Sequence, residues 1–149
     1  MDRSFVERNE ASRDRLTRAI AGLSLEDLER ADGDGWSVRV LLAHLAFWDR
    51  LVAARWRDAA RTVRTTPLDI PNELGDLINE AAAAGWDAIA TARAPELARD
   101  AAAEVDDLIR ALPDGAVAAV LEEGRPRLLD RSIHRSQHLD SIDRLIRPG

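Results

Sequence analysis

Helix-forming residues run through almost the whole chain, and its apolar side chains recur at helical spacing rather than in the alternation typical of strands. This pattern predicts an all-α protein. With 149 residues, 46% of them hydrophobic, the chain is long enough for one domain, residues 1–149, with a substantial core. Four amphipathic helices bury their apolar faces well in a four-helix bundle. The main helical segments are expected at about residues 4–23, 38–61, 72–92 with a continuation from Pro95 to Leu112, and 126–147.

The chain contains only three histidines, and two of them are spaced for a metal site. His134 and His138 are four residues apart in the last expected helix, so their side chains share one helix face. His44 lies on the apolar face of the second expected helix, together with Leu41 and Leu45. Two imidazoles at this spacing form half of a metal site, which a third histidine from another helix can complete. The other interpretation, three ordinary histidines hydrogen-bonded within the core, stays open on spacing alone.

The residues around the histidine pair favour one ion over two. The residue after His134 is Arg135, not the glutamate that acts as general base in His-Glu-x-x-His peptidases. The paired Glu-x-x-His pattern of di-iron bundles is also missing from the sequence. We therefore expect a mononuclear site, for which zinc, nickel and iron are the candidate metals.

Composition excludes several classes of protein. The chain has no Cys, Lys or Tyr, which removes disulfides, thiolate ligands, lysine Schiff bases and tyrosine nucleophiles. Its net charge of −6 comes from acids and arginines that are mixed along the chain, so we expect no nucleic-acid partner. The sequence has no apolar run of membrane-spanning length and no apolar signal core after Met1, so we expect a cytoplasmic protein with no membrane partner.

Three segments of the chain resemble DinB-like proteins. Residues 35–49 contain a Trp-Ser opening, an Ala-His-Leu and a Trp-acid pair, as the second helix of that family does. His134 and His138, followed by Ile142, resemble the motif of its fourth helix. Residues 76–80, with an Asn, resemble the opening of its third helix. The similarity extends over most of the chain.

This resemblance implies a fold, a cofactor and a range of activities. The fold would be a four-helix bundle of the DinB-like type with a long crossover between helices 2 and 3. A divalent ion would be held by His44, His134 and His138, with water completing its coordination shell. Similar proteins include transferases that use the thiols mycothiol, bacillithiol or glutathione, and others act as hydrolases. Homodimers are common among them, so we expect a homodimer that binds a small molecule.

The leading hypothesis for function is a metal-dependent, thiol-dependent S-transferase-like enzyme, in which the ion stabilises the thiolate. Arg131 and Arg135 are the nearest candidates in sequence to bind the carboxylates of a thiol cofactor, and the alternative for both is an exposed helix face. The second hypothesis is a metal-dependent hydrolase that uses activated water. The candidates for its general base are Asp49, Asp130 and Glu80.

The third hypothesis is a non-catalytic binding or stress-response module that has kept a metal site. Access to the ion separates these hypotheses. An ion that opens to a ligand-sized cavity favours an enzyme, and a sealed ion favours a structural role.

A few further side chains carry expectations about the site and its surroundings. Asp130 precedes His134 by four residues, so it could also orient that imidazole ring. Trp48 and Trp86 lie on apolar faces and are expected to anchor the core, whereas Trp56 is a candidate for a dimer contact.

Overall fold

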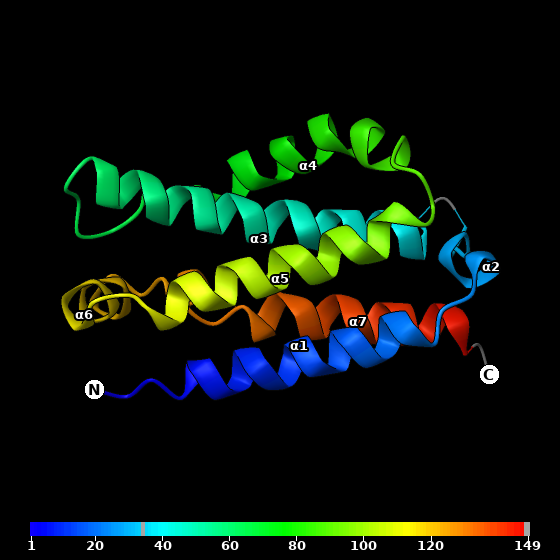
Figure 1. Ribbon diagram of the computed structural model, residues 1–149. Coiled ribbons are helices and arrows are strands. Elements are labelled where there is room, and N and C mark those ends of the chain that lie inside the picture. Colours follow the sequence, from blue (N-terminus) through cyan, green and yellow to red (C-terminus); the bar gives the residue numbers. More distant parts are fainter. Residues whose placement is uncertain (34, 148–149) are drawn as a thin grey trace.

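The computed structural model describes residues 1–33 and 35–147, and within these ranges it contains helices and no strand. The prediction of an all-α chain is therefore confirmed. The helices are α1 Phe5–Ala21, α2 Leu25–Leu28, α3 Val38–Arg61, α4 Asn72–Asp87, α5 Arg93–Arg110, α6 Asp114–Glu122, the 3-10 helix η1 Pro126–Leu128, and α7 Ser132–Ile146. Four of them, α1, α3, α5 and α7, run alongside one another as a bundle, and α4 packs on α3 (Figure 1).

A long crossover, residues 62–92, connects α3 to α5 and contains α4 (Figure 1). The sequence placed one helix over residues 72–92, but α4 ends earlier, at Asp87. The next helix begins at Arg93, two residues before Pro95. Pro95 thus lies in the first turn of α5, where backbone N–H groups have no partner within the helix, so its missing N–H costs no hydrogen bond.

Two apolar clusters fill the bundle, with buried polar side chains between them, and a third, smaller cluster lies between α3 and α4. One of the two larger clusters includes Trp56 and residues of α6, and the other includes Leu42 and Leu28 of α2. Along α1, Phe5 belongs to the first cluster and Leu16 to the second. The polar side chains between the clusters, which we call the polar layer, are Asn9, Ser12, Asp49, Asp106, Arg131 and Arg135.

Asn9 of α1 fixes the start of α7. Its Oδ1 accepts hydrogen bonds from the backbone N–H groups of Arg131 at 2.7 Å and Ser132 at 3.2 Å. Its Nδ2 donates to the carbonyl of Leu129 at 2.8 Å. Because the side chain of Arg131, at the N-cap position, makes no capping bond, the first helix supplies an acceptor for these N–H groups. This contact ties α1 to the helix that carries two of the histidines.

The tryptophans expected in the core or at an interface behave differently. Trp86 is buried, as predicted. Trp56 is also buried, and its Nε1 donates to the carbonyl of Leu128 at 2.9 Å. The expectation that Trp56 forms a dimer contact is therefore wrong, because its indole is enclosed by its own chain. Trp56 follows Val52 and Ala53 at helical spacing, so it lies on the buried face of α3 even though its neighbours in the sequence are polar.

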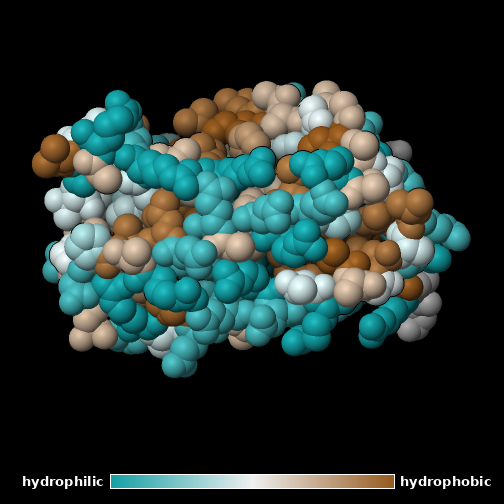
Figure 2. Space-filling model, in the orientation of Figure 1, coloured by the Kyte–Doolittle hydropathy of each residue, from teal (hydrophilic) through white to brown (hydrophobic). Residues whose placement is uncertain are grey.

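The outer face of α4 is the most apolar part of the surface in one view of the molecule. Figure 2 shows a largely hydrophilic face with apolar side chains gathered at its upper edge, over α4. Leu74 and Leu77 of this helix are exposed, and Trp86 is its one buried residue. None of the described helices combines the length and apolar character needed to span a membrane.

Candidate metal centre

The three histidines come together at the interface between helices α3 and α7. The Nε2 atom of His44 lies 3.0 Å from that of His134 and 3.1 Å from that of His138, and the last two are 3.1 Å apart. The imidazole rings are steeply inclined to one another, at 63°, 77° and 87°. Three ring nitrogens therefore converge on one point from three directions.

Helix geometry and aromatic packing set this arrangement. α3 begins where the sequence predicted, since the Ser37 hydroxyl accepts a hydrogen bond from the backbone N–H of Val40 and caps the helix. His44 then falls on the inner face of α3, with Trp36 and Trp86 packed against its ring at centroid distances of 4.9 Å and 5.1 Å. His134 and His138 share a face of α7 because one helical turn separates them.

The donor set fits a divalent metal ion better than a hydrogen-bonded cluster. A neutral imidazole carries one N–H, and the N–H or lone pair of each nitrogen lies in the ring plane and points outward from the ring, here toward the common centre of the three nitrogens. Lone pairs on the three Nε2 atoms would repel one another unless a cation lies between them. Metal–imidazole bonds of about 2.0–2.1 Å reach a common centre from nitrogens at this separation. The three residues form a group compatible with a metal site.

The Nδ1 atoms of two of these histidines lack, among the described residues, the hydrogen bonds that are usual at histidine metal sites. Metal-bound histidines usually donate their second N–H to a carboxylate or a carbonyl. The Nδ1 atoms of His44 and His134 are buried and have no hydrogen-bond partner among the described residues. Asp130 does not orient His134, because its carboxylate accepts from Arg8 at 2.7 Å and from Ser132. That expectation is wrong.

Burial keeps the histidines in the neutral form that binds metals. It lowers the pKa of His44 to about 3, with smaller contributions from His138 and Arg131. It lowers the pKa of His134 to about 2, and the nearby guanidinium of Arg131 acts in the same direction. Burial also lowers the pKa of His138. A positive ion therefore does not have to displace protons at neutral pH.

Acidification is expected to destabilise the metal-free protein. Between the lowered pKa values of the folded state and 6.5, the unfolded chain binds more protons than the folded one, so stability falls as the pH falls. At about pH 5 the loss should reach about 2 kcal/mol for each of His44 and His134. Urea unfolding of chelator-treated protein between about pH 7.5 and 5 measures it. In a His44→Phe variant the pH dependence should shrink by about a third to a half, because His134 and His138 still contribute, and an unchanged dependence would contradict this assignment.

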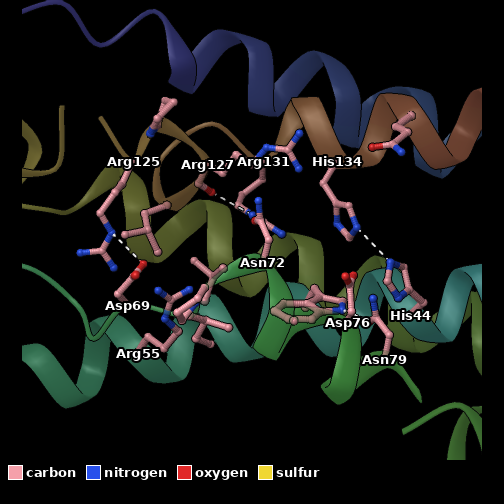
Figure 3. Close-up of a pocket in the computed structure, with 18 of the residues that line it drawn as sticks. His44, Arg55, Asp69, Asn72, Asp76, Asn79, Arg125, Arg127, Arg131 and His134 are labelled. Carbon is pink, nitrogen blue, oxygen red and sulfur yellow. Dashed lines mark hydrogen bonds and ion pairs between the residues drawn. The ribbon is translucent and has the colours of Figure 1, made fainter. Parts of the chain in front are cut away.

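A cavity of about 770 Å³ opens directly onto the three histidines. Its wall includes Trp48 and Asn79, which are hydrogen-bonded to each other through Nε1 and Oδ1 at 2.7 Å. Trp48 is only half-buried, so it is a wall residue of the cavity as well as an anchor between α3 and α4. The size is typical of small-molecule sites, which commonly measure about 300–1,000 Å³. Figure 3 shows the histidines at one end of the cavity and several arginines toward the other.

The two arginines expected at the cavity have separate positions, and neither lies on an exposed helix face. Arg131 lines the cavity, and its Nε donates to Asp49 at 2.8 Å. Arg135 is completely buried and is not a wall residue. Its guanidinium donates to both carboxylate oxygens of Asp106, at 2.7 Å and 2.9 Å, and to Asp49 at 3.1 Å. Arg135 is therefore not placed to bind a cofactor, and this corrects the expectation for it.

The carboxylates considered as general bases lie away from the histidines. Asp49 is paired with two arginines in the polar layer, and Glu80 is exposed and outside the cavity wall. Asp76, four residues before Glu80 on α4, lines the cavity instead and lies near His44 and His134 in the view of Figure 3. Its position within the family-like segment 76–80 was the one signal in the sequence that pointed to it.

Comparison with known proteins finds a family and no individual relative. The chain matches the family described as the DinB superfamily over residues 8–137. This range includes His44 and His134 and ends one residue before His138. Neither the curated proteins nor the solved structures contain a match to the chain.

Proposed function

Since this chain belongs to the DinB superfamily, we propose that it is a metal-dependent enzyme whose divalent ion, zinc, nickel or iron, is held by His44, His134 and His138. We propose further that the ligand of this ion is a low-molecular-weight thiol and that the reaction is transfer of the thiol sulfur. The observation that carries the proposal is the cavity, because all three histidines line a space large enough for a small molecule. A purely structural ion would not need such an opening.

The chemistry of the site agrees with a nucleophile that enters with the ligand. When bound, a divalent ion of this kind lowers the pKa of a coordinated thiol, or of a water molecule, and so supplies a nucleophile at neutral pH. The sequence offers no Cys, Lys or Tyr that could serve instead. Arg131 adds positive charge beside the histidines, which favours the anionic form of a bound thiol. The Trp36 and Trp48 side chains contribute apolar surface to the cavity wall.

A hydrolase is the second candidate, and the position of Asp76 is compatible with it. Asp76 places a carboxylate in the cavity wall on the side of the histidines (Figure 3). A carboxylate there can accept a proton from water or from a thiol, so its presence agrees with either reaction. The two functions differ in whether the thiol or the water molecule is the ligand. A binding experiment with thiols therefore separates them.

The proposal is tested with cobalt-substituted protein, whose visible spectrum reports the ligands of the ion. Addition of mycothiol, bacillithiol or glutathione should change that spectrum, with an intense sulfur-to-cobalt absorption for at least one of them. A His138→Ala variant, which lacks one of the proposed ligands, is the control for free cobalt. If the spectrum stays the same with all three thiols, the transferase function is wrong and the hydrolase or a non-catalytic binding role takes its place.

A further inference from the structure

The cavity beside the histidines has a charge opposite to that of the whole protein. Four arginines line it against two aspartates, Asp69 and Asp76, while the chain carries a net charge of −6. A positive cavity in a negative protein concentrates anionic ligands from solution. The four arginines are Arg55, Arg125, Arg127 and Arg131.

Two of these arginines lack a carboxylate partner among the described residues. Arg55 is partly buried and donates only to the backbone carbonyl of Leu68. Burial lowers the pKa of Arg55 to about 10, and the neighbouring guanidinium of Arg125 adds to this effect. Arg127 makes no side-chain hydrogen bond to a described residue, although its carbonyl accepts from Arg131 at 2.8 Å. Neither guanidinium forms an ion pair with a described residue, although the charge of Asp69 acts on Arg55 and Arg127 is exposed to solvent.

The other two arginines are held in place and frame this pair. Arg125 is fixed by Glu123 at 2.8 Å and by the carbonyl of Pro67 at 2.9 Å. Arg131 is held by Asp49, while its Nη2 group donates no hydrogen bond to a described residue. In Figure 3 the guanidinium of Arg131 lies between the histidines and the end of the cavity formed by Arg55 and Arg125. Anchored arginines of this kind bind an anion without first losing much side-chain freedom.

We infer that the guanidinium groups of Arg55 and Arg127 in the cavity wall form a binding subsite for carboxylate groups of the ligand. Two guanidinium groups that have no ion-pair partner among the described residues match a ligand with two carboxylates, since Arg binds carboxylates through paired hydrogen bonds. The inference rests on the proposed function in one respect, namely that the same ligand reaches the ion with its thiol. The proposed ligand is thus a thiol that carries carboxylates rather than an uncharged thiol.

Three small probes separate the carboxylate contacts from the thiol contact. Mercaptosuccinate carries a thiol and two carboxylates, 1-thioglycerol carries a thiol alone, and succinate carries two carboxylates alone. Their dissociation constants are measured by calorimetry on the cobalt-substituted protein, with the visible spectrum recorded in parallel. The variants are Arg55→Gln and Arg127→Gln. Arg99→Gln is the matched control. Arg99 is exposed and lies outside the cavity wall, and its replacement changes the net charge by the same amount as the cavity variants do.

Mercaptosuccinate should bind at least about tenfold more tightly than thioglycerol, and each cavity variant should weaken its binding about tenfold. Thioglycerol binding should stay the same in all variants, and succinate should bind without changing the spectrum. The subsite is wrong if both thiols bind equally well in wild type and in Arg55→Gln, or if Arg99→Gln weakens mercaptosuccinate as much as the cavity variants do. It is also wrong if succinate alters the cobalt spectrum.

The same data separate the two proposals. Arg55-dependent binding of succinate, together with a cobalt spectrum that neither thiol changes, would support the carboxylate subsite and refute thiol binding at the ion. Spectral changes with both thiols, together with equal dissociation constants for both thiols in every variant, would support thiol binding and refute the subsite.

Discussion

An Arg135→Met variant is expected to lose about 3–5 kcal/mol of the free energy of unfolding, because removal of one partner leaves buried charges without compensation. Arg135 is completely buried and lies in the polar layer, where it joins Asp106 of α5 to Asp49 of α3. It also reaches Ser12 of α1 at 3.3 Å. One side chain on α7 therefore contacts the other three helices of the bundle.

The effect comes from the carboxylates that remain. Burial raises the pKa of Asp106, and the hydrogen bonds from Arg135 oppose this rise. Without Arg135, the buried Asp106 either takes up a proton or stays charged in an apolar environment, and both cost free energy. Methionine has a similar volume, so loss of packing contributes little to the expected change.

Urea unfolding at neutral pH measures the change, with Arg57→Met as the control. Arg57 pairs with Glu104 at 2.6 Å on the surface, so its replacement should cost less than about 1 kcal/mol. If Arg135→Met does not fold, the milder Asp106→Asn variant takes its place and should still lose more than Arg57→Met. Equal losses for the buried and the exposed pair would show that the polar layer does not hold the bundle together.

Removal of the metal is expected to lower the stability of the folded protein, and this is the second of the two largest effects that we expect. An ion that binds only the folded protein stabilises it by about 2.7 kcal/mol at one hundred times its dissociation constant and about 4.1 kcal/mol at one thousand times. For a chain of this length, the melting temperature should rise by about 5–15 °C when zinc or nickel is added to chelator-treated protein. The three Nε2 atoms lie 3.0–3.1 Å from one another, and a cation between them would remove the repulsion of their lone pairs in the folded state.

Two variants of α7 separate this effect from general metal binding. His134→Ala removes one of the proposed ligands and should abolish the rise in melting temperature. Gln137→Ala removes an exposed residue of the same cavity wall and should leave the rise unchanged. An equal rise in wild type and His134→Ala would place the ion elsewhere.

The start of α3 and the shared face of His134 and His138 follow from local spacing in the sequence, whereas the meeting of this pair with His44 was implied by the resemblance to DinB-like proteins. The bounds of α3 agree with the apolar repeat and with Ser37 as its cap, because both signals lie within a few residues of the helix start. His134 and His138 share a face for the same local reason. The separate end of α4 at Asp87 was missed, since Ala-rich sequence favours helix without marking where it stops.

The polar layer was missed because its partners lie far apart in the sequence. Arg135 finds Asp49 and Asp106 on other helices, and no local pattern marks such a pairing. One signal was present nonetheless. Arg131 and Arg135 precede Leu139 at intervals of four residues, so all three share the buried face of α7. Charged residues in a core-facing position are buried only when paired, so this spacing could have indicated partners within the core.

The metal content of purified protein without a histidine tag tests the central claim most directly. Elemental analysis should find about one divalent ion per chain in the wild type, as expected for a mononuclear site with three imidazole ligands. His44→Ala and His138→Ala should each lose most of it, because His44 on α3 and His138 on α7 are both needed to complete the set. Full occupancy in either variant would contradict the account.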